Sequence, residues 1–233
     1  MAKVPVLARR IAPESRIVQL RISGGPMMVN AYLVESGEER ILVDTGVGKA
    51  PEAVLAAIRE ACGGDPTAIV LTHGHSDHAG SVAFLAEATG ARVYAHPAEI
   101  PFLTGQRAYG ELNQSFFYIQ SKRPKAWVTG PVQPLQDGER VGPLVAVHTP
   151  GHTPGHLVLW LEEERTALSG DILRESGGKV NTAPGLFTAD VKQNRESIRR
   201  LAAAIPEVER LCPAHGEPIL QGAGEGIRRF LGQ

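Results

Sequence analysis

One stretch of this sequence decides its fold and chemistry: Thr72-His73-Gly74-His75-Ser76-Asp77-His78. It follows a short apolar run that predicts a buried strand, and it leads into an Ala-rich segment that predicts a helix. Alternate side chains of an extended backbone point to the same side, so His73 and His75 can face one site. Four metal-competent side chains between His73 and His78 are denser than a strand–helix junction requires. The stretch therefore predicts a metal site at the end of a strand.

Three further candidate ligands also follow predicted strands, far away in the sequence. They are His152, Asp171 and His215. Sites in α/β proteins assemble at strand ends, and the Gly and Pro residues beside these three side chains favour tight turns there. Each of the three would more often be structural if it stood alone. Their agreement with the first stretch makes a set of seven candidate ligands.

The number of candidate ligands predicts two metal ions. A catalytic zinc ion uses about three protein ligands and keeps one position open, so a single ion cannot use all seven. Two ions can use them if one carboxylate bridges. Imidazole together with carboxylate favours zinc, iron or manganese over calcium. We expect two divalent ions per chain, with zinc as the first choice and iron or manganese as alternatives.

The rest of the sequence predicts a mixed α/β (α+β) chain. Runs of strand length lie at residues 17–22, 30–34, 40–43, 68–71, 91–95, 133–135, 144–147, 157–161, 166–168 and 208–211. Helices are predicted at residues 51–61, 79–88, 189–205 and 225–231, with a short helix from residue 97. Because a similar order of elements occurs twice, we expect a single domain over residues 1–233. It is built from two similar halves, about 1–130 and 131–233, that pack sheet on sheet.

Composition and charge exclude several classes of protein. The chain has 233 residues, of which 42% are hydrophobic and 21% charged, as in a globular protein with a substantial core. A net charge of −1 without long Lys or Arg runs argues against a nucleic-acid partner. No apolar window reaches the ~18 residues of a membrane span, and residues 1–15 lack an apolar core of signal-peptide length. We expect a cytoplasmic protein that acts on a small molecule, without a membrane partner.

Five motifs occur in an order that is typical of one family. They are Val43-Asp44-Thr45-Gly46, the stretch from His73 to His78 with Gly80, the stretch from Thr149 to Gly155, Gly170-Asp171, and His215-Gly216. With these motifs the chain resembles the metallo-β-lactamase-fold hydrolases, which include glyoxalase II and lactonases. The resemblance covers nearly the whole chain. It implies a four-layer αββα sandwich with the site along one edge of the two sheets.

The resemblance also implies how the ligands divide. His73, His75 and His152 would hold the first metal ion, Asp77, His78 and His215 the second, and Asp171 would bridge them. A hydroxide shared by two zinc ions would then cleave a small ester, thioester or lactone. Asp77 is the expected catalytic residue, which orients the hydroxide and passes a proton to the leaving group. Asp44 and His156 are expected to support the ligands rather than to bind metal.

Other members of the superfamily fit less well. Zinc β-lactamases carry Cys or Ser where Asp171 stands, and the 62 residues at positions 172–233 leave little room for the helical domain of a glyoxalase II. The alternative reading is a mononuclear iron sulfur dioxygenase that acts on a persulfide, because that enzyme shares the fold and the histidine motif. Metal content separates the two hypotheses.

Substrate contacts are expected from the aromatic segment at residues 103–131 and from the loop after Asp171. The candidates are Tyr109, Phe116, Phe117 and Asn181. The aromatic segment can form a lid or wall of the site. It can equally form the contact of a homodimer or pack on the sandwich. Both interpretations stay open at this point.

Overall fold

The computed structural model describes residues 6–23, 28–112 and 123–233. The N-terminal half forms a seven-stranded sheet in the order β1-β2-β3-β4-β5-β6-β7. Its strands are β1 (Val6–Arg10), β2 (Ile17–Ser23), β3 (Met28–Ser36), β4 (Glu39–Val43), β5 (Ala68–Val70), β6 (Arg92–Ala95) and β7 (Val132–Pro134). Pairing is antiparallel from β1 to β4 and parallel from β4 to β7. The first sheet therefore takes in β7, which follows residue 131.

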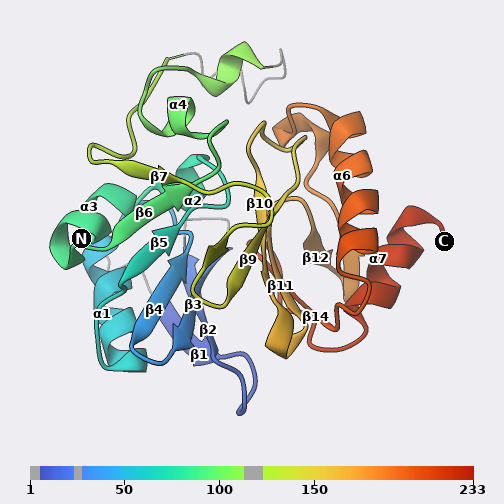
Figure 1. Ribbon diagram of the computed structural model, residues 1–233, viewed down its shortest axis with the longest axis horizontal. Coiled ribbons are helices and arrows are strands. Elements are labelled where there is room, and N and C mark those ends of the chain that lie inside the picture. The colour runs from blue at the N-terminus through green and yellow to red at the C-terminus, as the bar shows by residue number, and fades with distance from the viewer. Residues whose placement is uncertain (1–5, 24–27, 113–122) are drawn as a thin grey trace.

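The C-terminal half forms a five-stranded sheet in the order β14-β11-β10-β9-β8. Its strands are β8 (Arg140–Val141), β9 (Leu144–His148), β10 (Leu157–Leu161), β11 (Thr166–Gly170) and β14 (Arg210–Pro213). A separate two-stranded ribbon consists of β12 (Arg174–Ser176) and β13 (Lys179–Asn181). The two larger sheets face one another in the middle of the molecule (Figure 1).

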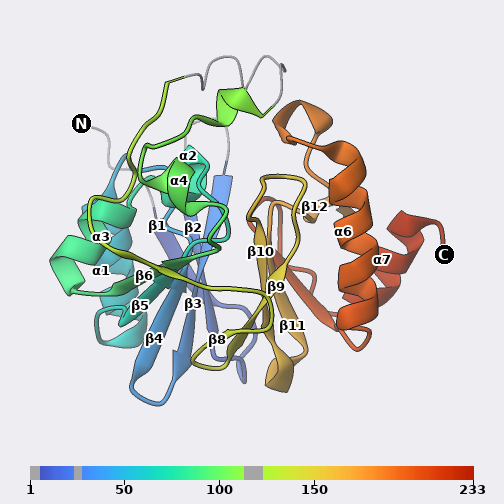
Figure 2. The same cartoon turned by 45° about the horizontal axis from the view of Figure 1, so that its top comes forward.

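Helices cover the outer face of each sheet, which gives four layers (Figures 1 and 2). Helices α1 (Pro51–Cys62) and α3 (Val82–Thr89) lie outside the first sheet, and α6 (Val191–Ala204) and α7 (Ala223–Leu231) lie outside the second. The short helices are α2 (Ser76–Ala79), α4 (Ile100–Leu103), η1 (Tyr109–Glu111), η2 (Glu162–Glu164) and η3 (Gly185–Phe187). The expected αββα sandwich is confirmed. Within the described residues, no helix is both long and apolar enough to cross a membrane.

Strand β3 shows why two sheets are needed. Its side chains alternate between two hydrophobic clusters: Ala31 and Leu33 pack towards the helices, whereas Tyr32 and Val34 pack towards the other sheet. Successive side chains of a strand point to opposite faces, so a strand that is apolar throughout must be covered on both. A third cluster joins the second sheet to α6 and α7. Three apolar layers thus hold the four structural layers together.

Strand direction places the functional loops. Strands β9, β11 and β14 run the same way, because β10 is antiparallel to both β9 and β11 and because β14 is parallel to β11. Strands β4 and β5 are parallel within the first sheet. The segments that follow these strands carry all seven candidate ligands and Asp44. Parallel strands deliver their following loops to one edge of a sheet, and here two such edges meet.

The structure differs from the sequence-based prediction at several elements. The helix expected at residues 79–88 is two helices, α2 and α3, and α2 begins at Ser76, so that Asp77 and His78 are helical. Strands β1, β8, β12 and β13 were not predicted. Each is short or lies at an edge, and β1 is half exposed and carries Arg9 and Arg10, so it lacks the apolar run that indicates a buried strand.

Candidate metal centre

The first group of candidate ligands is completely buried. His73 and His75 lie on the loop after β5, and His152 lies on the loop after β9. None of the three side chains is more than 6% exposed. One ligand atom from each of these residues and one from Asp171 lie within 4.8 Å of one another. His75 Nδ1 is 3.1 Å from His152 Nε2.

The second group is more open to solvent. It consists of Asp77, His78 and His215, whose ligand atoms also lie within 4.8 Å of one another. His215 Nε2 is 3.3 Å from Asp77 Oδ2, and His78 Nε2 is 3.8 Å from the same oxygen. The side chains of Asp77 and His215 are 22% and 19% exposed, whereas that of His78 is buried. This group therefore forms the face of the centre that a substrate can approach.

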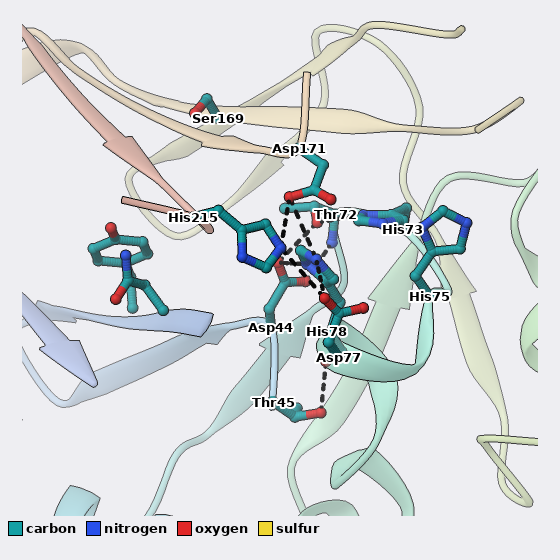
Figure 3. A network of polar contacts seen from close by, with 12 residues as sticks. Asp44, Thr45, Thr72, His73, His75, Asp77, His78, Ser169, Asp171 and His215 are labelled. Atoms are coloured by element: carbon teal, nitrogen blue, oxygen red, sulfur yellow. Dashed lines mark hydrogen bonds and ion pairs between the residues drawn. The ribbon is translucent and has the colours of Figure 1, made fainter. Parts of the chain in front are cut away.

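Asp171 lies between the two groups (Figure 3). Its Oδ1 is 3.5 Å from His78 Nε2 and 3.4 Å from His215 Nε2. Its other oxygen, Oδ2, is 3.4 Å from His152 Nε2. Each carboxylate oxygen thus faces a different group, which is the arrangement that a bridging carboxylate needs.

The distances between the candidate ligand atoms match those expected around a bound metal ion. Two ligand atoms on a tetrahedral zinc ion at about 2.0 to 2.1 Å lie about 3.3 Å apart. The separations around Asp171 and between His75 and His152 are 3.1–3.5 Å. The buried atoms that make no hydrogen bond with a described residue include three at this centre: His73 Nε2, His78 Nε2 and Asp171 Oδ1. Buried polar atoms without a hydrogen-bond partner are rare, and a bound metal ion would supply one.

The protonation state of the three histidines in the first group is the one that metal binding requires. Burial, together with the neighbouring imidazoles, lowers the pKa of His73 well below its ordinary value. Burial likewise lowers the pKa of His75 and of His152 to about 3. The three imidazoles are therefore neutral at physiological pH, as metal ligands must be.

The second group has the opposite electrostatics. Burial would lower the pKa of His78, but the carboxylates of Asp44, Asp171 and Asp77 outweigh it and raise that pKa well above its ordinary value. The pKa of His215 is raised in the same way, against burial, by Asp171 and Asp77. These carboxylates thus favour positive charge at both imidazoles, which is the electrostatic environment that a cation would need at this group.

Asp44 orients two of the ligands through its carboxylate. Its Oδ2 is 2.8 Å from His78 Nδ1 and accepts a hydrogen bond from the Thr72 hydroxyl, and its Oδ1 accepts one from the Thr72 backbone. The Thr72 hydroxyl in turn lies 3.1 Å from His73 Nδ1. With Nδ1 engaged on both rings, Nε2 of His73 and of His78 is directed to the centre. Asp44 adopts a φ of 62°, a left-handed backbone conformation that costs energy in residues other than glycine.

His156 supports Asp171 rather than pointing a free nitrogen at the centre. The Asp171 backbone N–H donates to His156 Nε2 at 3.1 Å, and His156 Nδ1 is 2.9 Å from the Thr149 hydroxyl. Burial lowers the pKa of His156 to about 3, so the ring is neutral and accepts this hydrogen bond. Both ring nitrogens are occupied, as expected of a supporting residue.

A cavity of about 530 Å³ opens onto the second group and onto His75 of the first. Asp77, Asp171 and His215 line it, together with two cations, Lys49 and Arg174, and an apolar wall that includes Val47, Pro184 and Phe187. The sequence did not single out Lys49 and Arg174. Lys49 follows the motif that contains Asp44, and Arg174 follows Asp171. Closeness in sequence to these motifs is the signal that could have identified both residues.

The four predicted substrate contacts are placed differently. Tyr109 lines a smaller cavity beside His75 and Ser76, and its hydroxyl is hydrogen-bonded to Glu99 and to the Gly74 backbone. Asn181 is exposed on β13 and is not part of the lining of the larger cavity. Phe116 and Phe117 lie outside the described residues. Substrate contact by all four stays a prediction.

Comparisons with known proteins agree with the fold and the centre. The model of the metallo-beta-lactamase superfamily matches residues 24–215. The chain is 31% identical over 193 residues to the "Probable metallo-hydrolase YybB" of Bacillus subtilis, covering 82% of each chain. It is 32% identical to "Thioesterase pkgB" of Emericella nidulans over 88% of this chain and 50% of that protein. A crystal structure of TTHA1623 in a di-iron-bound form has a TM-score of 0.66 and 37% identity, covering 85% of this chain and 92% of the other.

The matched family region extends from β3 to His215 and includes every candidate ligand. With its four-layer sandwich and its cluster of His and Asp side chains, this chain belongs to the metallo-beta-lactamase superfamily and is a metal-binding hydrolase of that superfamily.

Proposed function

We propose that the protein is a dinuclear hydrolase that cleaves a small thioester, ester or lactone. The observation that carries the proposal is the position of Asp171, whose two carboxylate oxygens face two separate groups of ligand atoms. His73, His75 and His152 would hold one ion, Asp77, His78 and His215 the other, and Asp171 both. Zinc is the proposed metal, and the di-iron form of TTHA1623 keeps iron as the main alternative.

Two bound divalent ions would lower the pKa of a shared water molecule and polarise the carbonyl oxygen of a substrate. The chain's own residues supply the remaining functions. Asp77 lines the cavity and belongs to the second group, so its carboxylate can accept a proton from the attacking water and return it to the leaving group. His78 and His215 lower the pKa of Asp77 to about 2 against the effect of burial, so the carboxyl group is ionised in the metal-free centre.

The cavity supports a carboxylic acid derivative as substrate. Its apolar wall suits an acyl chain, and Lys49 and Arg174 suit a polar or anionic group at the other end of the same molecule. The likeness to a protein named as a thioesterase favours the thioester among these substrates. Asp171 stands where zinc β-lactamases carry Cys or Ser, which argues against antibiotic hydrolysis.

A substrate panel tests the proposal. Thioesters, lactones, aryl esters and phosphodiesters should be offered to the zinc, manganese and iron forms, with the Asp77→Asn variant as the control for contaminating hydrolases. We expect hydrolysis of at least one carboxylic acid derivative and its loss in Asp77→Asn. Loaded protein that cleaves none of them would refute the proposal. One iron ion per chain, with oxygen uptake on a persulfide, would establish the dioxygenase instead.

A further inference from the structure

A buried glutamate connects the two loops of the first ligand group. Glu99 is 0% exposed and immediately precedes α4, beyond the end of β6. Its Oε1 accepts a hydrogen bond from the Gly155 backbone N–H at 2.8 Å. Its Oε2 accepts one from the Gly74 backbone N–H at 3.1 Å and one from the Tyr109 hydroxyl. Every one of these neighbours is a donor, so the site is shaped for a carboxylate.

The two glycines belong to the ligand loops themselves. Gly74 separates His73 from His75, and Gly155 follows His152 by three residues. The first loop follows a strand of the first sheet, and the second joins β9 to β10 of the other sheet. One side chain therefore links the two sheets at the point where the first ligand group forms.

The packing around Glu99 leaves no freedom at either glycine. A Cβ on Gly155 would lie 2.8 Å from Glu99 Cγ, and a Cβ on Gly74 would lie 2.4 Å from the Tyr109 hydroxyl oxygen. Such distances are far below van der Waals contact, so only glycine permits the approach. Gly155 is thus explained by the close approach of Glu99, and Gly74 by that of the Tyr109 hydroxyl, which is itself hydrogen-bonded to Glu99.

We propose that Glu99 is a positioning residue that sets the separation of His73 and His75 from His152, and thereby the affinity of the first metal ion. This inference rests on the metal centre of the proposed function. The three donors around the Glu99 carboxylate are neutral groups, so its negative charge also favours a cation in the first ligand group.

The Glu99→Gln variant tests this role with little change in volume. The amide presents an NH₂ group to neighbours that are donors, so at least one of the three hydrogen bonds is lost. The measurement is zinc affinity by competition with a chromophoric chelator, made in a His215→Ala background so that only the first ligand group contributes. We expect the affinity to fall by about 10- to 100-fold, the range for groups that orient ligands.

Glu164→Gln is the matched control. Glu164 is also a nearly buried carboxylate, with 11% side-chain exposure, and it accepts the Arg16 backbone N–H at 2.7 Å. It lies in η2, before the start of β11, whereas the centre lies after the end of β11. Zinc affinity should be unchanged in this variant, even where its melting temperature falls as much as that of Glu99→Gln.

Several outcomes would overturn the inference, and a separate one would overturn its premise. Unchanged zinc affinity in Glu99→Gln, or equal losses in Glu99→Gln and Glu164→Gln, would overturn it. If Glu99→Gln does not fold, Tyr109→Phe removes the hydroxyl that donates to Glu99 and accepts from the Gly74 backbone N–H, and it keeps the carboxylate; we expect a loss of about three- to tenfold. No loss would again overturn the inference. Absence of zinc binding in the His215→Ala protein with Glu99 intact would refute the metal centre itself.

Discussion

The two ligand groups of the centre are chemically unlike. The first group is made of buried, neutral imidazoles whose pKa values are lowered, to about 3 for His75 and His152. The second group contains His78 and His215, whose pKa values are raised by the surrounding carboxylates, and two of its three members, Asp77 and His215, line the cavity, as does His75 of the first group. In the proposed dinuclear centre, the first ion would lie in a more buried site and the second where substrate and solvent meet.

The largest effect should come from Asp77→Asn, which changes the second group while leaving the first intact. The variant loses the proton acceptor and one ligand of the second ion, so we expect kcat to fall about a thousandfold or more. The first ion should remain bound, because none of its ligands is altered. Steady-state kinetics and metal analysis on the same sample measure both quantities; unchanged turnover would refute the role of Asp77.

The next largest effect is expected in the pH dependence of metal affinity, which should differ between the two ligand groups. Any proton on His78 or His215 must be released before a second ion binds, and the raised pKa values of these two groups make protons stronger competitors for that site. As the pH is lowered, the affinity for the second ion should therefore fall, by up to about tenfold per pH unit for each proton displaced. The first-ion affinity should stay nearly constant between pH 6 and 8, since His75 and His152 are already neutral there. Equal slopes for the two ions in chelator titrations would contradict the comparison.

A smaller effect on metal affinity is expected from Asp44→Asn, which alters a residue that contacts the second group without being a candidate ligand. The amide replaces a carboxylate that accepts from the backbone and hydroxyl of Thr72 and faces His78 Nδ1. We expect the affinity of the second ion to fall about tenfold. Asp137→Asn is a suitable control, because Asp137 accepts the His148 backbone N–H at 2.7 Å and does not face the candidate ligands. If both variants bind the second ion equally well, Asp44 has no role in orienting His78.

The metal centre was largely accessible from sequence because its members sit in recognisable local patterns. His73 to His78 are adjacent, and His152, Asp171 and His215 follow short strands with Gly or Pro beside them. The packing of sheet on sheet was predicted from the repeated order of elements, and the αββα sandwich from the resemblance to the metallo-β-lactamase fold.

Other features depend on contacts that no local pattern encodes. Glu99 binds the backbone of Gly74 and Gly155, and these residues come together only when the two sheets pack. The break between α2 and α3 at Gly80 accompanies a hydrogen bond from its N–H to the Gly46 carbonyl, 34 positions earlier. Lys49 and Arg174 became candidates only once the cavity between distant loops was defined.

Metal stoichiometry tests the central claim most directly. Purified chain, saturated with zinc and freed of excess metal, should contain two ions per chain by elemental mass spectrometry, and the His215→Ala variant should contain one. Asp171→Ala should lose affinity for both ions, because its two oxygens face both groups. A wild-type chain that holds a single ion at saturation, with His215→Ala unchanged from it, would contradict the two-group account.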